Sequence, residues 1–248
     1  MQVKTDGVVL KVQNYNDDDR LLTILTRSSG VVYAFAGGAQ KMRSRLANVC
    51  SPLCYADFEL FKNRDKYVVD SAEMKTLFYG LREDLTTVTY ATYFCELAMT
   101  MAPSEEPADD VLRLLLNTLH MLETGKRSPD VLKAIMELRL MSIGGYRPDL
   151  VACESCGGAD KAPFWFSAED GNILCDDCAK TMGRGTRLEL GKGAFSAARH
   201  IVYSPLEQLF SFTVGERAQA ELSAAAERYA LAQTDNEYRS LEFLKSLR

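Results

Sequence analysis

The hydrophobic pattern of this 248-residue chain changes near residue 80, and this change constrains the fold more than any other feature. Before it, short β-branched and aromatic runs are separated by turn-forming residues at 28–30 and 63–65. After it, apolar residues recur every three or four positions. Five short strands in about seventy residues are typical of a small closed barrel. We therefore expect an α+β protein whose first domain is a five-stranded barrel, with strands at residues 3–12, 21–26, 31–36, 55–61 and 67–71.

The first strand should alternate between two faces. A period of two places Val8, Leu10 and Val12 on one face of residues 3–12. Val3, Thr5 and Val9 then lie on the other face.

The second part of the chain is predicted to be an all-helical domain. Pro103 and Pro107 end its first helix, Gly125 ends the second, and Pro129 opens the third. We expect domains at residues 1–80 and 81–248, with an insertion at about 150–180. The helices should begin near residue 81, near 111 and at 129, and should also cover 192–203, 215–232 and 237–247.

Two Cys-x-x-Cys pairs in the insertion predict a metal site. Eighteen residues separate the second cysteine of the first pair from the first cysteine of the second pair. This spacing is typical of paired zinc knuckles, and four thiolates would fill the shell of one structural Zn²⁺ per chain. A redox dithiol is the alternative, but no βαβ unit accompanies the pairs. The expected ligands are Cys153, Cys156, Cys175 and Cys178.

The cellular setting follows from the cysteines and from the N-terminus. Seven cysteines are an odd number, which suits a reducing cytosol better than a disulfide framework. The first twenty residues carry four aspartates instead of a signal-peptide core, and no apolar run reaches the roughly 18 residues of a membrane span. We expect a cytoplasmic protein without a membrane partner.

Basic charge is concentrated near the N-terminus, although the whole chain carries a net charge of −5. Residues 20–56 contain no Asp or Glu, whereas residues 81–248 hold 18 Lys and Arg against 25 Asp and Glu. The inserted cysteine module is also acidic. A nucleic-acid site is therefore expected in the barrel domain, with cations Arg20, Arg27, Lys41, Arg43 and Arg45.

A basic loop and two aromatic residues are the expected contacts with a nucleic acid. If residues 40–45 are extended, their three cations point the same way and suit a phosphate backbone. A solvated loop is the alternative. Bases stack on aromatic side chains in small barrels, and Tyr33 and Phe35 are the best candidates, since most other barrel aromatics are expected in the core.

Catalysis finds little support in the sequence. His120 and His200 lie in apolar helical stretches, and no phosphate-binding Gly-rich motif occurs. The three adjacent aspartates at 17–19 lack the spacing of a calcium loop. We expect no enzyme activity. A nuclease with dispersed carboxylates and a zinc-ribbon adaptor that binds proteins remain the alternatives.

Several segments of the chain form an ordered set of short motifs. In the first domain these are residues 8–11, 15, 19–23, 37–39 and 44–46. In the second they are residues 137–141, 145–150, the two cysteine pairs, 205–210 and 240–244. Taken in this order, they resemble the bacterial RecO recombination mediators. Two positions depart from the family: Asn16-Asp17-Asp18 replaces Gly-Glu, and Gly37-Gly38 replaces Lys-Gly.

The resemblance implies an N-terminal OB-fold barrel and a helical domain with a four-cysteine zinc site. It implies binding of single-stranded and double-stranded DNA, annealing of complementary strands, and loading of a RecA-type recombinase onto DNA coated by single-stranded DNA-binding protein. RecR and the C-terminal tail of single-stranded DNA-binding protein are the implied partners. Because the helical domain is acidic, we expect it to dock proteins, and its candidate cations for the acidic tail are Arg199, Arg217, Arg228 and Arg239.

Overall fold

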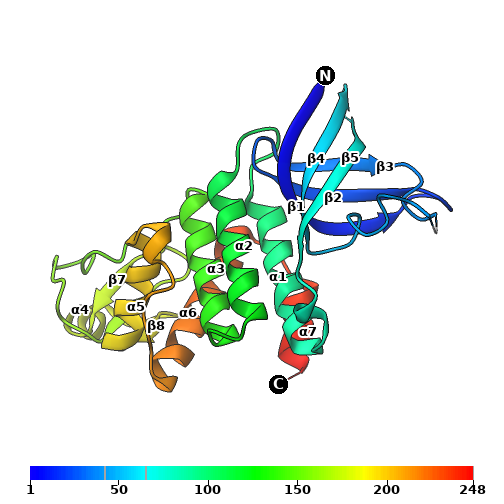
Figure 1. Ribbon diagram of the computed structural model, residues 1–248. Helices are drawn as coiled ribbons and strands as arrows, with labels where there is room; N and C mark the ends of the chain where they lie inside the picture. The colour runs from blue at the N-terminus through cyan, green and yellow to red at the C-terminus, as the bar shows by residue number, and fades with distance from the viewer. Residues whose placement is uncertain (42, 65, 248) are drawn as a thin grey trace. The chain divides into compact units, whose positions relative to one another are not determined.

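The computed structural model describes residues 1–41, 43–64 and 66–247. Two compact units are formed (Figure 1). One contains Met1–Thr124 and the C-terminal segment from Arg239; the other contains Gly125–Tyr238. The first unit thus combines the barrel with three α-helices.

The barrel is closed and contains the five expected strands. Its strand order is β1-β2-β3-β5-β4, and β4 pairs back onto β1. All neighbours are antiparallel except β3 and β5, which are parallel. This OB-type barrel and the helical remainder confirm the predicted fold class. The strands are β1 Gln2–Asn14, β2 Arg20–Thr26, β3 Gly30–Ala36, β4 Cys54–Asn63 and β5 Lys66–Leu77.

Apolar side chains fill the barrel. Leu22, Ile24 and Phe58 are almost completely buried there. Burial of a side chain of this size stabilises a fold by about 1.5–3 kcal/mol. Cys50 and Cys54 lie in the same cluster, and burial raises the pKa of each thiol to about 11.

The alternation predicted for β1 is wrong in its middle. Val8, Val9 and Leu10 are all buried, and the register shifts between Val9 and Lys11. Val9 faces the barrel interior, whereas Val8 pairs with Leu25 on the outer surface. That surface is buried because α1 contacts β1, and α2 contacts β1 and β2. A strand buried on both faces loses the simple period of two.

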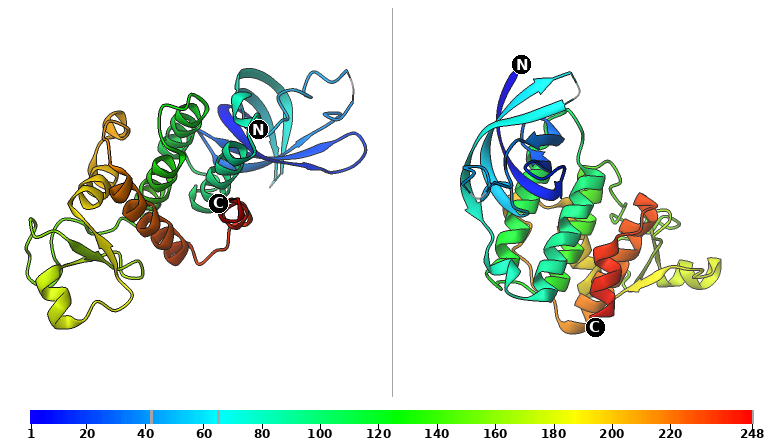
Figure 2. Two further views of the ribbon diagram at one scale, coloured as in Figure 1. Left: turned by 90° about the horizontal axis from the view of Figure 1, so that it is seen from below. Right: turned by 90° about the vertical axis from the view of Figure 1, so that its right-hand side faces the viewer.

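Three helices complete the first unit: α1 Leu85–Met101, α2 Asp109–Glu123 and α7 Arg239–Ser246. The first begins four residues later than predicted because Gly80–Arg82 forms a 3₁₀ turn and Asp84 caps α1. The Asp84 carboxylate accepts a hydrogen bond of 2.7 Å from Thr87 N. The C-terminal helix α7 packs against α1 (Figure 2).

The second unit contains three long helices and a small sheet. Helix α3 packs against α5 and α6. The three-stranded sheet has the order β7-β6-β8 and, together with α4, forms the insertion predicted between the helices. The elements are α3 Pro129–Ile143, β6 Phe164–Phe166, β7 Ile173–Cys175, α4 Asp176–Met182, β8 Leu188–Leu190, α5 Lys192–Tyr203, a 3₁₀ turn Leu206–Gln208 and α6 Glu216–Thr234.

Within the described ranges, no helix has both the length and the apolar character needed to cross a membrane.

Candidate metal centre and nucleic-acid interface

The four predicted cysteines come together in the second unit. In the first pair, Cys153 accepts a hydrogen bond from Gly157 N and donates its own N–H to the Gly158 carbonyl. Gly157 has a φ of +69°, which glycine adopts without strain. In the second pair, Cys175 ends β7 and Cys178 lies in α4. The first pair is therefore presented by a tight turn, and the second pair by the end of β7 and the first turn of α4.

The positions of the sulfur atoms fit one tetrahedral metal ion. All four Sγ atoms lie within 4.8 Å of one another, and those of Cys156 and Cys175 are 3.7 Å apart. Zinc–thiolate bonds of about 2.3 Å in a tetrahedron place sulfur atoms about 3.8 Å apart. These cysteines could hold a metal ion, and a set of four leaves no position for a reactive water.

The electrostatics of the cluster favour at least one thiolate. Burial opposes ionisation of Cys153, but N–H groups of Cys175, Cys156 and Ser155 outweigh it and lower its pKa to about 6. Ser155 also lowers the pKa of Cys178, yet the neighbouring cysteines raise it to about 12. The cysteines beside Cys178 thus oppose its ionisation, and a bound cation would relieve this effect.

One part of the barrel surface is left open by the helices. Tyr33 is 60% exposed on the outer face of β3, and Phe35 is half-buried beside it. Strand pairing continues this face, because Phe35 is opposite Val68 and Val68 is opposite Phe61. Val68 and Phe61 are 41% and 51% exposed. We call this surface, with Tyr15 and Lys66, the open barrel face.

Tyr15 and Lys66 were missed by the sequence analysis. The Tyr15 ring lies edge-on to Phe35, with centroids 4.9 Å apart. The Lys66 ammonium is 5.8 Å from the centroid of the same ring. Both residues lie far from Phe35 in the sequence, so only the folded barrel brings them together. An aromatic ring flanked by a cation is a suitable platform for a base next to its phosphate.

The basic loop after β3 turns instead of extending. Ser44 N donates to Lys41 O at 2.9 Å, and Cys50 N donates to Leu46 O at 2.9 Å. The three cations are therefore not carried by an extended segment, and the prediction that such a segment points them all the same way is wrong. Arg43 and Arg45 are exposed, and Lys41 forms an exposed ion pair of 3.2 Å with Asp18. These three cations remain predicted phosphate contacts.

Arg20 and Arg27 are placed differently from the loop cations. Arg20 is half-buried and donates to Cys50 O at 2.9 Å. Arg27 donates two hydrogen bonds, of 2.8 and 2.7 Å, to the Asp6 carboxylate and also pairs with Asp109. The Asp6 pKa falls to about 2 because of the Arg27 hydrogen bonds, against burial and with help from Tyr55. Arg27 thus joins β1, β2 and α2, and the structure does not bring it together with the basic loop.

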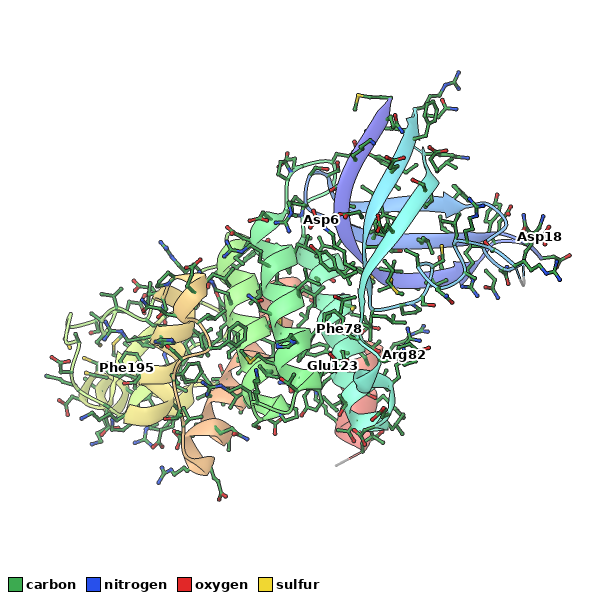
Figure 3. All side chains as sticks on the ribbon, viewed as in Figure 1. Asp6, Asp18, Phe78, Arg82, Glu123 and Phe195 are labelled. Atoms are coloured by element: carbon green, nitrogen blue, oxygen red, sulfur yellow. The ribbon has the colours of Figure 1, made fainter. Side chains whose placement is uncertain are left out.

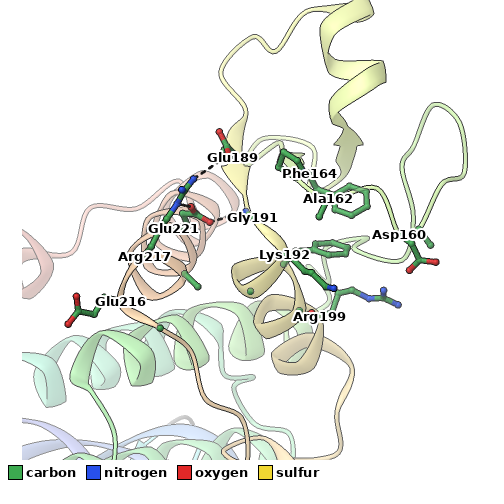
Figure 4. Close-up of a pocket in the computed structure, with 17 residues that line it drawn as sticks. Asp160, Ala162, Phe164, Glu189, Gly191, Lys192, Arg199, Glu216, Arg217 and Glu221 are labelled. Carbon is green, nitrogen blue, oxygen red and sulfur yellow. Dashed lines mark hydrogen bonds and ion pairs between the residues drawn. The ribbon is translucent and has the colours of Figure 1, made fainter.

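A pocket of 1030 Å³ opens on the second unit (Figure 4). Phe164 and Phe195 lie in its wall with ring centroids 4.2 Å apart, and the Arg199 guanidinium lies over Phe195 at 5.5 Å. Arg217, also in the wall, is bound to Glu221 at 2.8 Å. Of the other predicted cations, Arg228 pairs with Glu169 at 3.4 Å, and Arg239 lies in α7 of the first unit. Of the four predicted cations, Arg199 is therefore the one that lies over an aromatic ring of the pocket wall. The wall also contains Lys192 and four acids: Asp160, Glu189, Glu216 and Glu221.

Comparison with known proteins covers almost the whole chain. The model of the family "Recombination protein O N terminal" matches residues 1–78, and that of "Recombination protein O C terminal" matches residues 82–242. A DNA repair protein RecO from Acetivibrio thermocellus is 35% identical over 245 residues, covering 99% of this chain and 97% of the relative. One from Symbiobacterium thermophilum is 33% identical, covering 98% and 96%. The chain belongs to the RecO family of DNA repair and recombination proteins.

Proposed function

We propose that this protein binds single-stranded DNA on the open barrel face and acts as a recombination mediator without enzyme activity. The observation that carries the proposal is the exposed aromatic surface beside Lys66, on a part of the barrel wall away from the strand contacts of α1 and α2. RecO membership supports the DNA repair role.

Stacking and charge would act together on this face. Bases would stack on Tyr33 and Phe35, each stacked base contributing about 1–3 kcal/mol. Phosphates would contact Lys66 and the basic loop. Neither interaction distinguishes one base from another, so binding should tolerate any sequence.

Alanine substitutions of exposed aromatics test the site. We expect Tyr33→Ala and Phe35→Ala each to weaken binding of a labelled oligonucleotide about tenfold, measured by fluorescence anisotropy. Phe243→Ala is a matched control, because Phe243 is 46% exposed but lies on α7. Equal effects of all three substitutions would contradict the assignment.

Strand annealing and partner binding are the further functions expected from the family. We propose that the protein also binds double-stranded DNA, anneals complementary strands, and works with RecR to load a RecA-type recombinase onto coated strands. Annealing of two labelled strands should slow in Phe35→Ala in proportion to its lost affinity. Unchanged annealing would separate that activity from the open barrel face. A labelled strand incubated with the protein and magnesium should stay intact, because a mediator without enzyme activity does not hydrolyse DNA.

The tail of single-stranded DNA-binding protein is proposed to dock in the pocket beside Phe195. Its acidic residues suit Arg199, and its apolar residues suit the aromatic wall. We expect Arg199→Ala to weaken binding of a tail peptide about tenfold, by calorimetry. Arg228→Ala is the control, since that guanidinium already pairs with Glu169. Loss of binding in the control alone would overturn this choice of surface.

The metal is proposed to be one structural Zn²⁺ per chain. Four thiolates at these separations suit zinc, and they would supply folding energy without chemistry. The cytoplasm, where free thiols persist, is the proposed location.

A further inference from the structure

The loop between β1 and β2, residues 15–19, is bonded along its length to the basic loop. Gly38 N donates to the Asp19 carboxylate at 2.7 Å. Gln40 N donates to Asp18 O at 2.9 Å, and the Gln40 amide donates to Asn16 O and Asp19 O at 2.5 and 2.9 Å. The two loops therefore form one hydrogen-bonded structure at the end of the barrel, where Figure 3 labels Asp18.

The two neighbouring aspartates make different contacts in this structure. Asp19 is half-buried, and its second carboxylate oxygen accepts from the Asn16 amide at 2.8 Å. Hydrogen bonds from Gly38 N and Asn16 lower the pKa of Asp19, so its carboxylate is charged and bonded on both oxygens. The Asp18 carboxylate, in contrast, is exposed and contacts the Lys41 ammonium at 3.2 Å.

We infer that these acids act on the DNA site in opposite ways: Asp19 positions the basic loop for phosphates, and Asp18 competes with phosphates for Lys41. The inference rests on the proposed single-strand binding. Gly38 has a φ of +65°, so the chain reverses at the point where Asp19 holds its N–H. Without that bond, residues 38–41 would be less ordered in the free protein. Ordering them would then cost free energy when DNA binds. Lys41, by comparison, must leave Asp18 before it can contact a phosphate.

A matched pair of variants, Asp18→Ala and Asp19→Ala, separates the two roles. Each removes one negative charge from adjacent positions and leaves the hydrogen bonds between backbone atoms, such as that from Gln40 N to Asp18 O, in place. Simple electrostatics predicts that both variants tighten oligonucleotide binding. We expect Asp18→Ala to tighten it about two- to threefold, which is the range of an exposed ion pair. We expect Asp19→Ala to weaken it about fivefold, comparable to ordering one further residue on binding.

A second background shows whether Asp19 acts through the basic loop. In the Lys41→Ala/Arg43→Ala/Arg45→Ala triple variant, Asp19→Ala should cause no further loss of affinity. Asp19→Asn keeps an oxygen for Gly38 N and should bind with intermediate affinity, and it replaces Asp19→Ala if that variant melts early. Anisotropy with a labelled oligonucleotide and thermal unfolding are the two measurements.

The outcomes separate this inference from the proposed function. The inference is supported if Asp18→Ala and Asp19→Ala shift the oligonucleotide affinity in opposite directions and Asp19→Ala leaves the affinity of the triple variant unchanged. The inference is overturned, even if the wild type binds DNA, if both variants shift the affinity in the same direction. It is also overturned if Asp19→Ala weakens binding as much in the triple variant as in the wild type. A wild type that binds no oligonucleotide overturns the proposed function itself.

Discussion

The Asp6–Arg27 pair lends itself to a stability test whose size follows from the structure. Only 13% of the Asp6 side chain is exposed, and its pKa is lowered from 3.8 to about 2, mainly by the Arg27 hydrogen bonds. At 1.36 kcal/mol for each pKa unit, this shift corresponds to about 2 kcal/mol. We expect Asp6→Asn to lower the free energy of unfolding of the barrel unit by about that amount at pH 7.

The pH dependence gives the sign of the effect. A carboxyl whose pKa is depressed in the folded state stabilises the fold above its unfolded pKa, near 3.8 here, and loses this contribution as pH falls toward about 2. The wild type should therefore approach Asp6→Asn in stability between pH 4 and pH 2. Urea titrations at pH 7, 4 and 2.5, read by pulsed hydrogen exchange of barrel peptides, measure this convergence.

Two further results belong to the same test. The single tryptophan, Trp165, lies in the other compact unit, and its fluorescence transition should not move in Asp6→Asn. The salt dependence of DNA binding should also stay as in the wild type, because the Asp109 carboxylate still pairs with Arg27 in that variant. A destabilisation of equal size at pH 7 and pH 2.5 would refute the reasoning.

Two other predictions concern the metal and a backbone contact. Elemental analysis should find about one zinc per chain. Cys153→Ser or a chelator should lower the melting temperature of the second unit, and metal-free protein with an unchanged melting temperature would refute a structural role. Gly30→Ala should cost more than 2 kcal/mol of barrel stability, because a Cβ there would lie 1.9 Å from Pro103 O. Gly125→Ala, at a similar φ of +61° but with no atom within 4 Å, is the control and should cost about 1 kcal/mol, so equal losses in chemical denaturation would contradict the steric argument.

The fold could be predicted largely from local patterns. Strand and helix periods depend on neighbouring residues, and the four thiols were found because Cys-x-x-Cys turns are local as well. The middle of β1 could not be predicted in this way. Val8 is buried by helices that follow more than seventy residues later, and no local period contains that information.

The candidate DNA site could be predicted only in part. Residues 20–56 contain no acid in the sequence, but folding brings acids to them: Asp6 and Asp109 reach Arg27, and Asp18 reaches Lys41. Charge counted along a window differs from charge in space. Tyr15 and Lys66 were missed for the same reason, since strand pairing and loop docking place them beside Phe35.

The salt dependence of oligonucleotide binding tests the central claim most directly. The affinity of the wild type and of Lys41→Ala/Arg43→Ala/Arg45→Ala should be measured by anisotropy across a series of salt concentrations. Each lost single-strand phosphate contact reduces the slope of log affinity against log salt by about 0.7, so the triple variant should lose about two units of slope and bind every sequence more weakly. A folded triple variant with the slope and affinity of the wild type would contradict the claim that the barrel and its basic loop hold the strand.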